Sequence, residues 1–175
     1  MPNLIKPLLY LFFILIVPSA SNAHHFIGAE ILWDKIAQDS FKITVKIYRD
    51  CNGSKMSNIS LLAEYPTCVG STKLTLKPGA STDITPMCQG QCNRCLSSGC
   101  DLKYGIEHIE YIGFLTTASR RKSGCCEVLL SIFECCRGNG ISTGASGTKL
   151  ILQSSLNICV KGDNSSPKFV KLPDN

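Results

Sequence analysis

The chain has 175 residues, a formal net charge of +5 and 11 cysteines, and 44% of its residues are hydrophobic. Its lysines and arginines are scattered rather than arranged in a stripe with interleaved aromatic residues, so the composition excludes a typical nucleic-acid-binding protein. The densest basic group, Arg120-Arg121-Lys122, is short and is expected to be a solvated turn between two strands.

Residues 1–23 have the three-part layout of a secretory signal peptide. Lys6 precedes an apolar run from Leu8 to Val17, and small residues lead up to Ala23. That run is too short to span a bilayer, which needs about 20 residues. We therefore expect cleavage after Ala23, a mature chain that begins at His24, and export to the periplasm or the cell surface without a transmembrane span. Removal of 23 residues from 175 leaves 152, enough for one domain.

Most of the mature chain has the pattern of short β-strands separated by turn residues. Residues 41–48 and 107–115 alternate between apolar and polar side chains, which places one apolar face inward. Residues 126–133 are nearly all apolar, which predicts a central strand covered on both faces. With no long helical periodicity, the pattern predicts an all-β, antiparallel sandwich over residues 24–162. Further strands are expected at 27–33, at 72–76 before Pro78-Gly79, and at 149–160.

The cysteines are predicted to form disulfides because the leader directs the chain to an oxidising compartment. Four of them crowd the segment from Cys88 to Cys100, which has no strand pattern and would be ordered by crosslinks rather than by a core. The number of cysteines is odd, so at least one is free or pairs between chains, which leaves a covalent dimer open. The disulfide candidates are Cys51, Cys68, Cys88, Cys92, Cys95, Cys100, Cys125, Cys126, Cys135, Cys136 and Cys159.

Strand geometry restricts the partners of these cysteines. If the run between Cys126 and Cys135 is one strand, the two residues lie about 30 Å apart and cannot bond to each other, because a disulfide requires Cα atoms about 5.5 Å apart. Adjacent residues on a strand point to opposite faces, so Cys135 and Cys136 should form bridges in two directions. We hypothesise that one of them bonds to Cys51 and the other to the Cys88–Cys100 segment.

Two metal-binding alternatives compete with a module that has no cofactor and no catalytic site. Four thiolates in the Cys88–Cys100 segment could hold structural zinc, but their spacing is irregular and export favours oxidation. The terminal amine and imidazole of His24 could bind copper, in the manner of secreted oxidases with a histidine brace, if His25 or His108 lay close. The one G-x-S-x-G match, Gly140 to Gly144, lies in a glycine-rich stretch that we expect to be a flexible hairpin, without the strand and helix that flank a nucleophile elbow. The leading expectation is therefore a non-enzymatic protein.

Four segments, in order, resemble one family of exported proteins. They are His-Phe-Ile-Gly-Ala-Glu-Ile at 25–31, Ile-Tyr-Arg-Asp-Cys-Asn-Gly at 47–53, Cys-Cys-Arg-Gly-Asn-Gly-Ile at 135–141 and Asn-Ser-Ser-Pro-Lys-Phe at 164–169. These segments are similar to motifs of the N-terminal module of large surface proteins of Bacteroidota, which are described as gliding motility-associated or adhesin-like. The resemblance covers essentially the whole mature chain.

The resemblance implies an immunoglobulin-like β-sandwich without known catalysis. It also implies a role at the cell surface in adhesion, in gliding-associated surface assembly, or in binding a protein or glycan partner. Members of the family often carry further sandwich domains and a C-terminal sorting domain. Residues 163–175 are accordingly expected to be a linker toward a following domain that this chain does not include.

Overall fold

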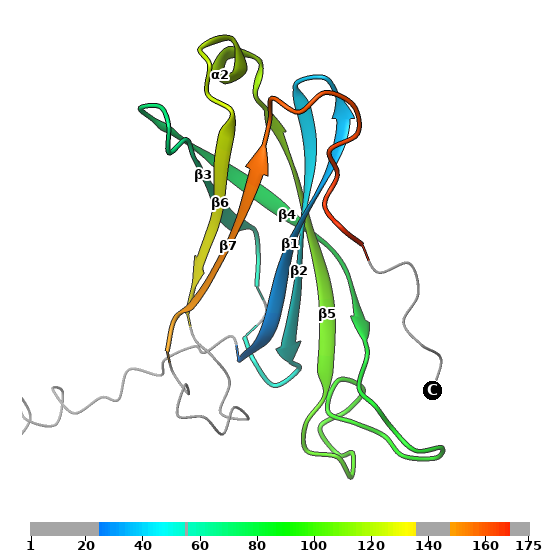
Figure 1. Cartoon of the computed structure of the whole chain (residues 1–175). Coiled ribbons are helices and arrows are strands. Elements are labelled where there is room, and N and C mark those ends of the chain that lie inside the picture. The colour runs from blue at the N-terminus through cyan, green and yellow to red at the C-terminus, as the bar shows by residue number, and fades with distance from the viewer. Residues whose placement is uncertain (1–24, 55, 136–147, 169–175) are drawn as a thin grey trace, which may run out of the picture.

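The computed structural model describes residues 25–54, 56–135 and 148–168, and within them it forms seven strands and one short helix (Figure 1). The helix α2 (Ala118–Lys122) lies between the fifth and sixth strands. The all-β, antiparallel architecture predicted from the sequence is confirmed. No helix in these ranges is long and apolar enough to cross a membrane. The strands are β1 (Phe26–Ala37), β2 (Ser40–Asp50), β3 (Ile59–Glu64), β4 (Ser71–Asp83), β5 (Ile106–Thr116), β6 (Glu127–Glu134) and β7 (Leu150–Asn157).

The strands form one antiparallel sheet in the order β1-β2-β5-β4-β3-β6-β7. This sheet curls around a single core until its two edges, β1 and β7, come into contact, so that the fold resembles a nearly closed barrel (Figure 1). It does not contain the two clearly separate sheets of the expected immunoglobulin-like sandwich. The reason is β4, whose first part pairs with β3 and whose second part pairs with β5.

The core is built by the alternation of side chains along the central strands, as the sequence pattern predicted. The apolar side chains of β2 point inward and are at most 1% exposed. On β5, the face that carries Ile109, Tyr111 and Leu115 is also buried. Val45 and Tyr111 face each other in the β2–β5 register, which continues over the full length of both strands. The inward residues of β2 are Phe41, Ile43, Val45 and Ile47.

The sequence prediction that a strand ends at Pro78-Gly79 is wrong, because β4 continues through these residues to Asp83. The pairing with β5 shifts between Pro78 and Ser81, which marks a β-bulge. Proline lacks an N–H group for the ladder, and a Cβ on Gly79 would lie 3.3 Å from the carbonyl oxygen of Glu110. The irregularity therefore bends β4 at the point where it passes from one half of the sheet to the other.

Two further differences concern the half of the sheet that contains β3 and β6. The strand β3 was not predicted, because its six residues give only a short alternation. The strand predicted at 126–133 is β6, but its outer face is covered only in part. Ser131 is buried there, whereas Phe133 is 52% exposed beside Ile151 of β7.

A serine-containing segment after β7 covers the open edge of β1. The backbone N–H of Trp33 donates to Ser166 Oγ (3.0 Å), and the N–H of Ser166 donates back to the Trp33 carbonyl (2.8 Å). The N–H of Lys35 donates to Ser165 Oγ (3.3 Å), and Lys168 forms an ion pair with Asp34. These contacts satisfy backbone groups that an edge strand otherwise presents to other chains. The first residues of the predicted linker are therefore docked on the domain.

The basic group at 120–122 forms α2 and binds neighbouring turns, rather than only facing water. Arg121 donates to both carboxylate oxygens of Asp39 in the β1–β2 turn, and this hydrogen bonding holds the pKa of Asp39 below its usual range. The guanidinium of Arg120 lies 4.6 Å from the ring centroid of Tyr65 and donates to the Val69 carbonyl (3.0 Å). α2 thus links two turns at one end of the barrel.

The burial of Leu130 on β6, an interior strand of the sheet, gives a prediction about stability. Leu130 is fully buried between β3 and β7, so Leu130→Ala removes core contacts and leaves a cavity. We expect it to lower the free energy of unfolding by about 2–5 kcal/mol. Ile151→Ala, at a 55% exposed position of β7, is the matched control and is expected to cost less than about 1 kcal/mol. Denaturant unfolding measures both, and equal costs would contradict the packing described here.

Candidate binding surface at the β4–β5 loop

Four disulfides crosslink the described part of the chain. They are Cys51–Cys95, Cys68–Cys125, Cys92–Cys100 and Cys126–Cys159. Four disulfides indicate a protein that folds in an oxidising compartment outside the cytoplasm. Among the described residues the free cysteine is Cys88, which is exposed.

The hypothesis that Cys51 bonds to Cys135 or Cys136 is wrong, because Cys51 bonds to Cys95. The companion hypothesis, a bridge from this pair to the Cys88–Cys100 segment, is also wrong. In that segment Cys92 and Cys100 bond to each other, Cys95 bonds to Cys51, and Cys88 is free. The face of a strand on which a cysteine lies restricts the direction of its disulfide. It does not show that a long loop folds back onto the end of β2. Cys135 has a partner, and Cys136 lies outside the described residues.

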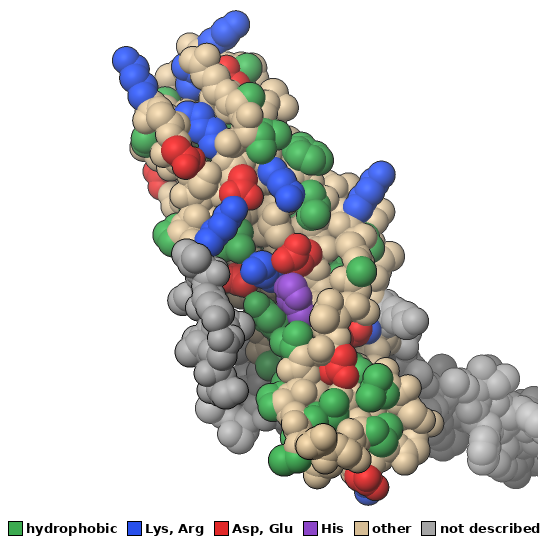
Figure 2. Space-filling model, turned by 90° about the vertical axis from the view of Figure 1, so that its right-hand side faces the viewer, with side chains coloured by type: hydrophobic (Ala, Val, Ile, Leu, Met, Phe, Trp, Pro, Cys, Tyr) green, Lys and Arg blue, Asp and Glu red, His purple; other side chains and the backbone are tan. Residues whose placement is uncertain are grey.

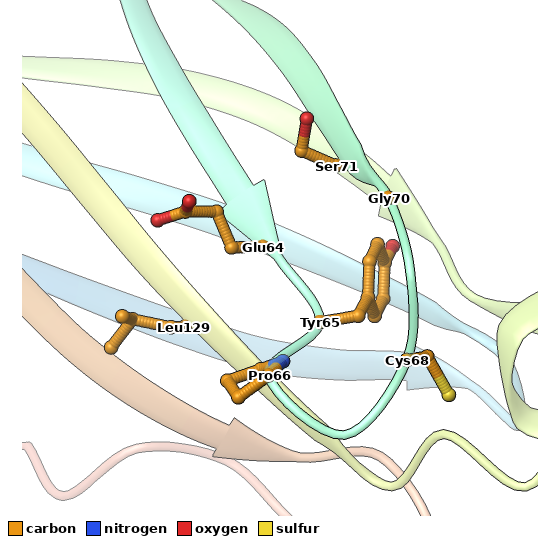
Figure 3. Close-up of a pocket in the computed structure, with 7 residues that line it drawn as sticks. All are labelled: Glu64, Tyr65, Pro66, Cys68, Gly70, Ser71 and Leu129. Atoms are coloured by element: carbon orange, nitrogen blue, oxygen red, sulfur yellow. The ribbon is translucent and has the colours of Figure 1, made fainter.

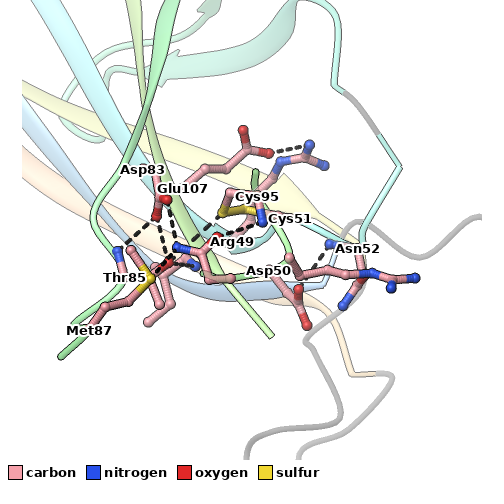
Figure 4. The surroundings of a disulfide bond; sticks show 12 residues. Arg49, Asp50, Cys51, Asn52, Asp83, Thr85, Met87, Cys95 and Glu107 are labelled. Atoms are coloured by element: carbon pink, nitrogen blue, oxygen red, sulfur yellow. Dashed lines mark hydrogen bonds and ion pairs between the residues drawn. A yellow bond between two sulfur atoms is a disulfide. The ribbon is translucent and has the colours of Figure 1, made fainter. Parts of the chain in front are cut away.

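The β4–β5 loop, residues 84–105, is the longest connection between described strands and is fixed at several points. Cys95 anchors its middle to Cys51 at the end of β2 (Figure 4). The Cys92–Cys100 disulfide closes a smaller ring within the loop. The N–H of Cys51 also donates to the Gly105 carbonyl (3.0 Å). Crosslinks of this kind reduce the conformational freedom of the unfolded chain. A loop with little apolar core is thereby held in one conformation.

A polar cluster at the base of the loop completes this anchoring (Figure 4). One carboxylate oxygen of Asp83 accepts from the N–H (2.9 Å) and hydroxyl (2.5 Å) of Thr85, and the other accepts from the Asn93 amide (2.6 Å). The hydrogen bonds from Thr85, followed by that from Asn93, hold the pKa of Asp83 below its usual range. The Asn93 side chain is fully buried, and its oxygen accepts from the N–H of Cys95 (2.7 Å). Asn93 therefore connects β4 to the disulfide.

A buried ion pair lies beside this disulfide at the ends of β2 and β5. Arg49 is 2% exposed and pairs with Glu107, which faces it in the strand register. Arg49 also donates to the Ser54 carbonyl. The neighbouring Asp50 accepts from the N–H of Asn52 (2.9 Å) and so caps the turn that follows β2. The charged residues of the 47–53 motif thus have structural partners, and breaking a buried pair of this kind is costly.

The β4–β5 loop carries several large apolar side chains that are exposed to solvent. Figure 2 shows hydrophobic side chains gathered on the lobe at the lower end of the molecule. On the β4–β5 loop, Leu96 is 66% exposed and Tyr104 is 52% exposed. Binding residues are often carried on loops that a rigid scaffold positions, and exposed apolar groups favour contact with a partner. The large exposed apolar residues of the loop are Ile84, Met87, Leu96 and Tyr104.

A hollow of about 500 Å³ lies beside the β3–β4 turn (Figure 3). It is lined in part by Glu64, Tyr65 and Leu129. The Tyr65 ring is already engaged by the Arg120 guanidinium, and Cys68 bonds to Cys125. These contacts make Tyr65 and Cys68 parts of the structural framework.

The residues considered for metal binding are placed in different surroundings. Three of the four sulfurs that a zinc site at Cys88–Cys100 would require are in disulfides. His108 stacks on Tyr48, with ring centroids 5.2 Å apart, and the carbonyl of His25 accepts from the Asp50 N–H (3.1 Å). Ala23 and His24 lie outside the described residues. In the ranges that the structure describes, no group of three or more His, Cys, Asp or Glu side chains could hold a metal ion.

Comparisons of the chain with protein-family models, with curated proteins and with solved structures found no match. The case for a binding site at the β4–β5 loop therefore comes from the geometry of the loop alone. Sequence reasoning located the cysteine-rich segment but missed Asn93, Arg49 and Glu107 as its supports. A signal was available for Arg49, because it continues the period of two that buries Ile43, Val45 and Ile47 on the same strand.

The close packing around Gly105 leads to a prediction about the rigidity of the β4–β5 loop. A Cβ at this position would lie 2.6 Å from Cys95 Sγ, 2.9 Å from Cys95 N and 3.1 Å from Asn93 Oδ1. Gly105→Ala is therefore expected to displace the disulfide and increase hydrogen exchange across residues 84–105. Gly99→Ala is the control, because its Cβ would meet only Ser97 Oγ, at 3.9 Å. Unchanged exchange in Gly105→Ala would show that this packing does not hold the loop.

Proposed function

We propose that the chain is a non-enzymatic, exported binding module that acts at the cell surface or in the periplasm, and that the β4–β5 loop is its contact surface. One observation carries the proposal: a loop fixed by two disulfides and a buried polar cluster presents four large apolar side chains to solvent. Pre-ordering of such a loop lowers the entropic cost of binding, which favours recognition of a partner. A protein or a glycan at the cell surface is the class of partner that we propose.

The resemblance of four segments to surface modules of Bacteroidota supports the same proposal. Under it, the chain serves adhesion or gliding-associated surface assembly. We also propose that the fold is a variant of the immunoglobulin-like sandwich in which β4 changes sheets at its bulge. The order of the strands supports this view. The second part of β4 pairs with β5, which continues to β2 and β1, and the first part pairs with β3, which continues to β6 and β7.

Binding measurements on the mature, oxidised protein test the proposed function. The probes are a printed array of cell-surface glycans and immobilised outer-membrane proteins of Bacteroidota. We expect binding to at least one probe class and a loss of about tenfold or more when Leu96→Ser and Tyr104→Ser are combined, because exposed apolar anchors dominate many interfaces. Val69→Ser is the control, since Val69 is 96% exposed on the β3–β4 turn, away from the loop.

Two results would contradict the proposed function. One is the absence of binding to either probe class by the correctly oxidised protein. The other is binding that the loop double variant and the Val69→Ser control retain equally. In the second case a different surface would hold the partner.

A further inference from the structure

A polar, cationic hollow of about 550 Å³ lies between the β4–β5 loop and the turn after β2. One of its walls belongs to the ring closed by the Cys92–Cys100 disulfide, so that wall is covalently fixed. Its lining contains an amide, a hydroxyl, a guanidinium and an ammonium group, and no large apolar side chain. The lining residues are Asn52, Arg94, Ser98, Gly99, Cys100 and Lys103.

The guanidinium of Arg94 is held in place within the hollow. Its Nε donates to Asn52 Oδ1 (2.6 Å), and its Nη1 donates to the Ser98 carbonyl (2.5 Å). A guanidinium has five N–H donors, so both N–H groups of Nη2 and one of Nη1 remain for a ligand. Because the side chain is already ordered, less entropy is lost when it binds an anion.

Lys103 supplies a second positive charge to the lining of the same hollow. Its carbonyl accepts from the Asn52 amide nitrogen (3.1 Å), so Asn52 joins Arg94 and Lys103 through one side chain. Its ammonium group has no hydrogen-bond or ion-pair partner among the residues that the structure describes. Neither nearby acid is among the lining residues: Asp50 accepts from the N–H of Asn52, and Asp101 is exposed.

We propose that this hollow binds the carboxylate of an acidic saccharide, a uronate. This inference rests on the proposed binding function and adds the class of the ligand. A guanidinium with free Nη donors fits a carboxylate, and a neighbouring ammonium adds charge. The amide and hydroxyl groups beside them match the hydroxyls of a sugar ring. A protein partner is less well suited, because protein interfaces centre on apolar or aromatic pockets that this lining does not contain.

Calorimetric titration of the mature, oxidised protein with tetragalacturonate tests the proposal. We expect binding that weakens with added salt, and no binding of cellotetraose, a neutral oligosaccharide of the same length. Arg94→Gln and Lys103→Gln should each reduce the affinity about tenfold or more, because each removes a charged hydrogen bond. Lys73→Gln, at an exposed position on the first half of β4, is the matched control and should leave the affinity unchanged.

Lys103→Gln keeps the test decisive if Arg94→Gln disturbs the loop, because the Lys103 ammonium holds no part of the described structure. The proposal is overturned by an absence of tetragalacturonate binding, by equal affinity in Lys103→Gln and Lys73→Gln, or by equally tight binding of a tetraglutamate peptide. If the uronate does not bind but the Leu96 and Tyr104 substitutions still abolish binding in the array experiment, the ligand class is wrong and the binding function stands. If neither experiment shows loop-dependent binding, the proposed function is wrong as well.

Discussion

The Cys51–Cys95 disulfide determines how the β4–β5 loop is attached to the sheet. It joins the end of β2, an interior strand of the sheet, to the middle of a loop that has almost no core of its own. The two cysteines are 44 residues apart, and in a chain-entropy description a crosslink of this span stabilises the fold by about 4 kcal/mol. The bond thereby transfers the rigidity of the barrel to the β4–β5 loop.

The polar contacts around this disulfide depend on the same junction. Asn93 links Asp83 of β4 to the N–H of Cys95, and Gly105 lets the returning chain pass against the sulfur. On the other side, Asn52 follows Cys51 directly and positions Arg94. The Cys51–Cys95 bond is therefore next to the buried cluster through Asn93 and Cys95, and next to the hollow through Cys51 and Asn52. The apolar surface and the cationic hollow belong to one ordered unit.

The framework could be predicted from the sequence where a repeating pattern reports burial. The alternation in β2 and β5 identified the inward residues, and the apolar run at 126–133 located β6. The pattern failed where the tertiary structure decides. Pro78-Gly79 suggested a chain break, but a bulge accommodates both residues within β4. The partner of Cys51 was missed because a loop without periodicity gives no sign of where it folds back.

Non-reducing peptide mapping of the mature protein, with mass spectrometry, tests this account most directly. It should recover a peptide pair joined through Cys51 and Cys95, a second crosslink between Cys92 and Cys100, and an alkylatable Cys88. A crosslink from Cys51 to Cys135 or Cys136 would contradict it. In that case the β4–β5 loop would not be anchored to the end of β2, and neither its apolar surface nor the Arg94 hollow would be pre-ordered.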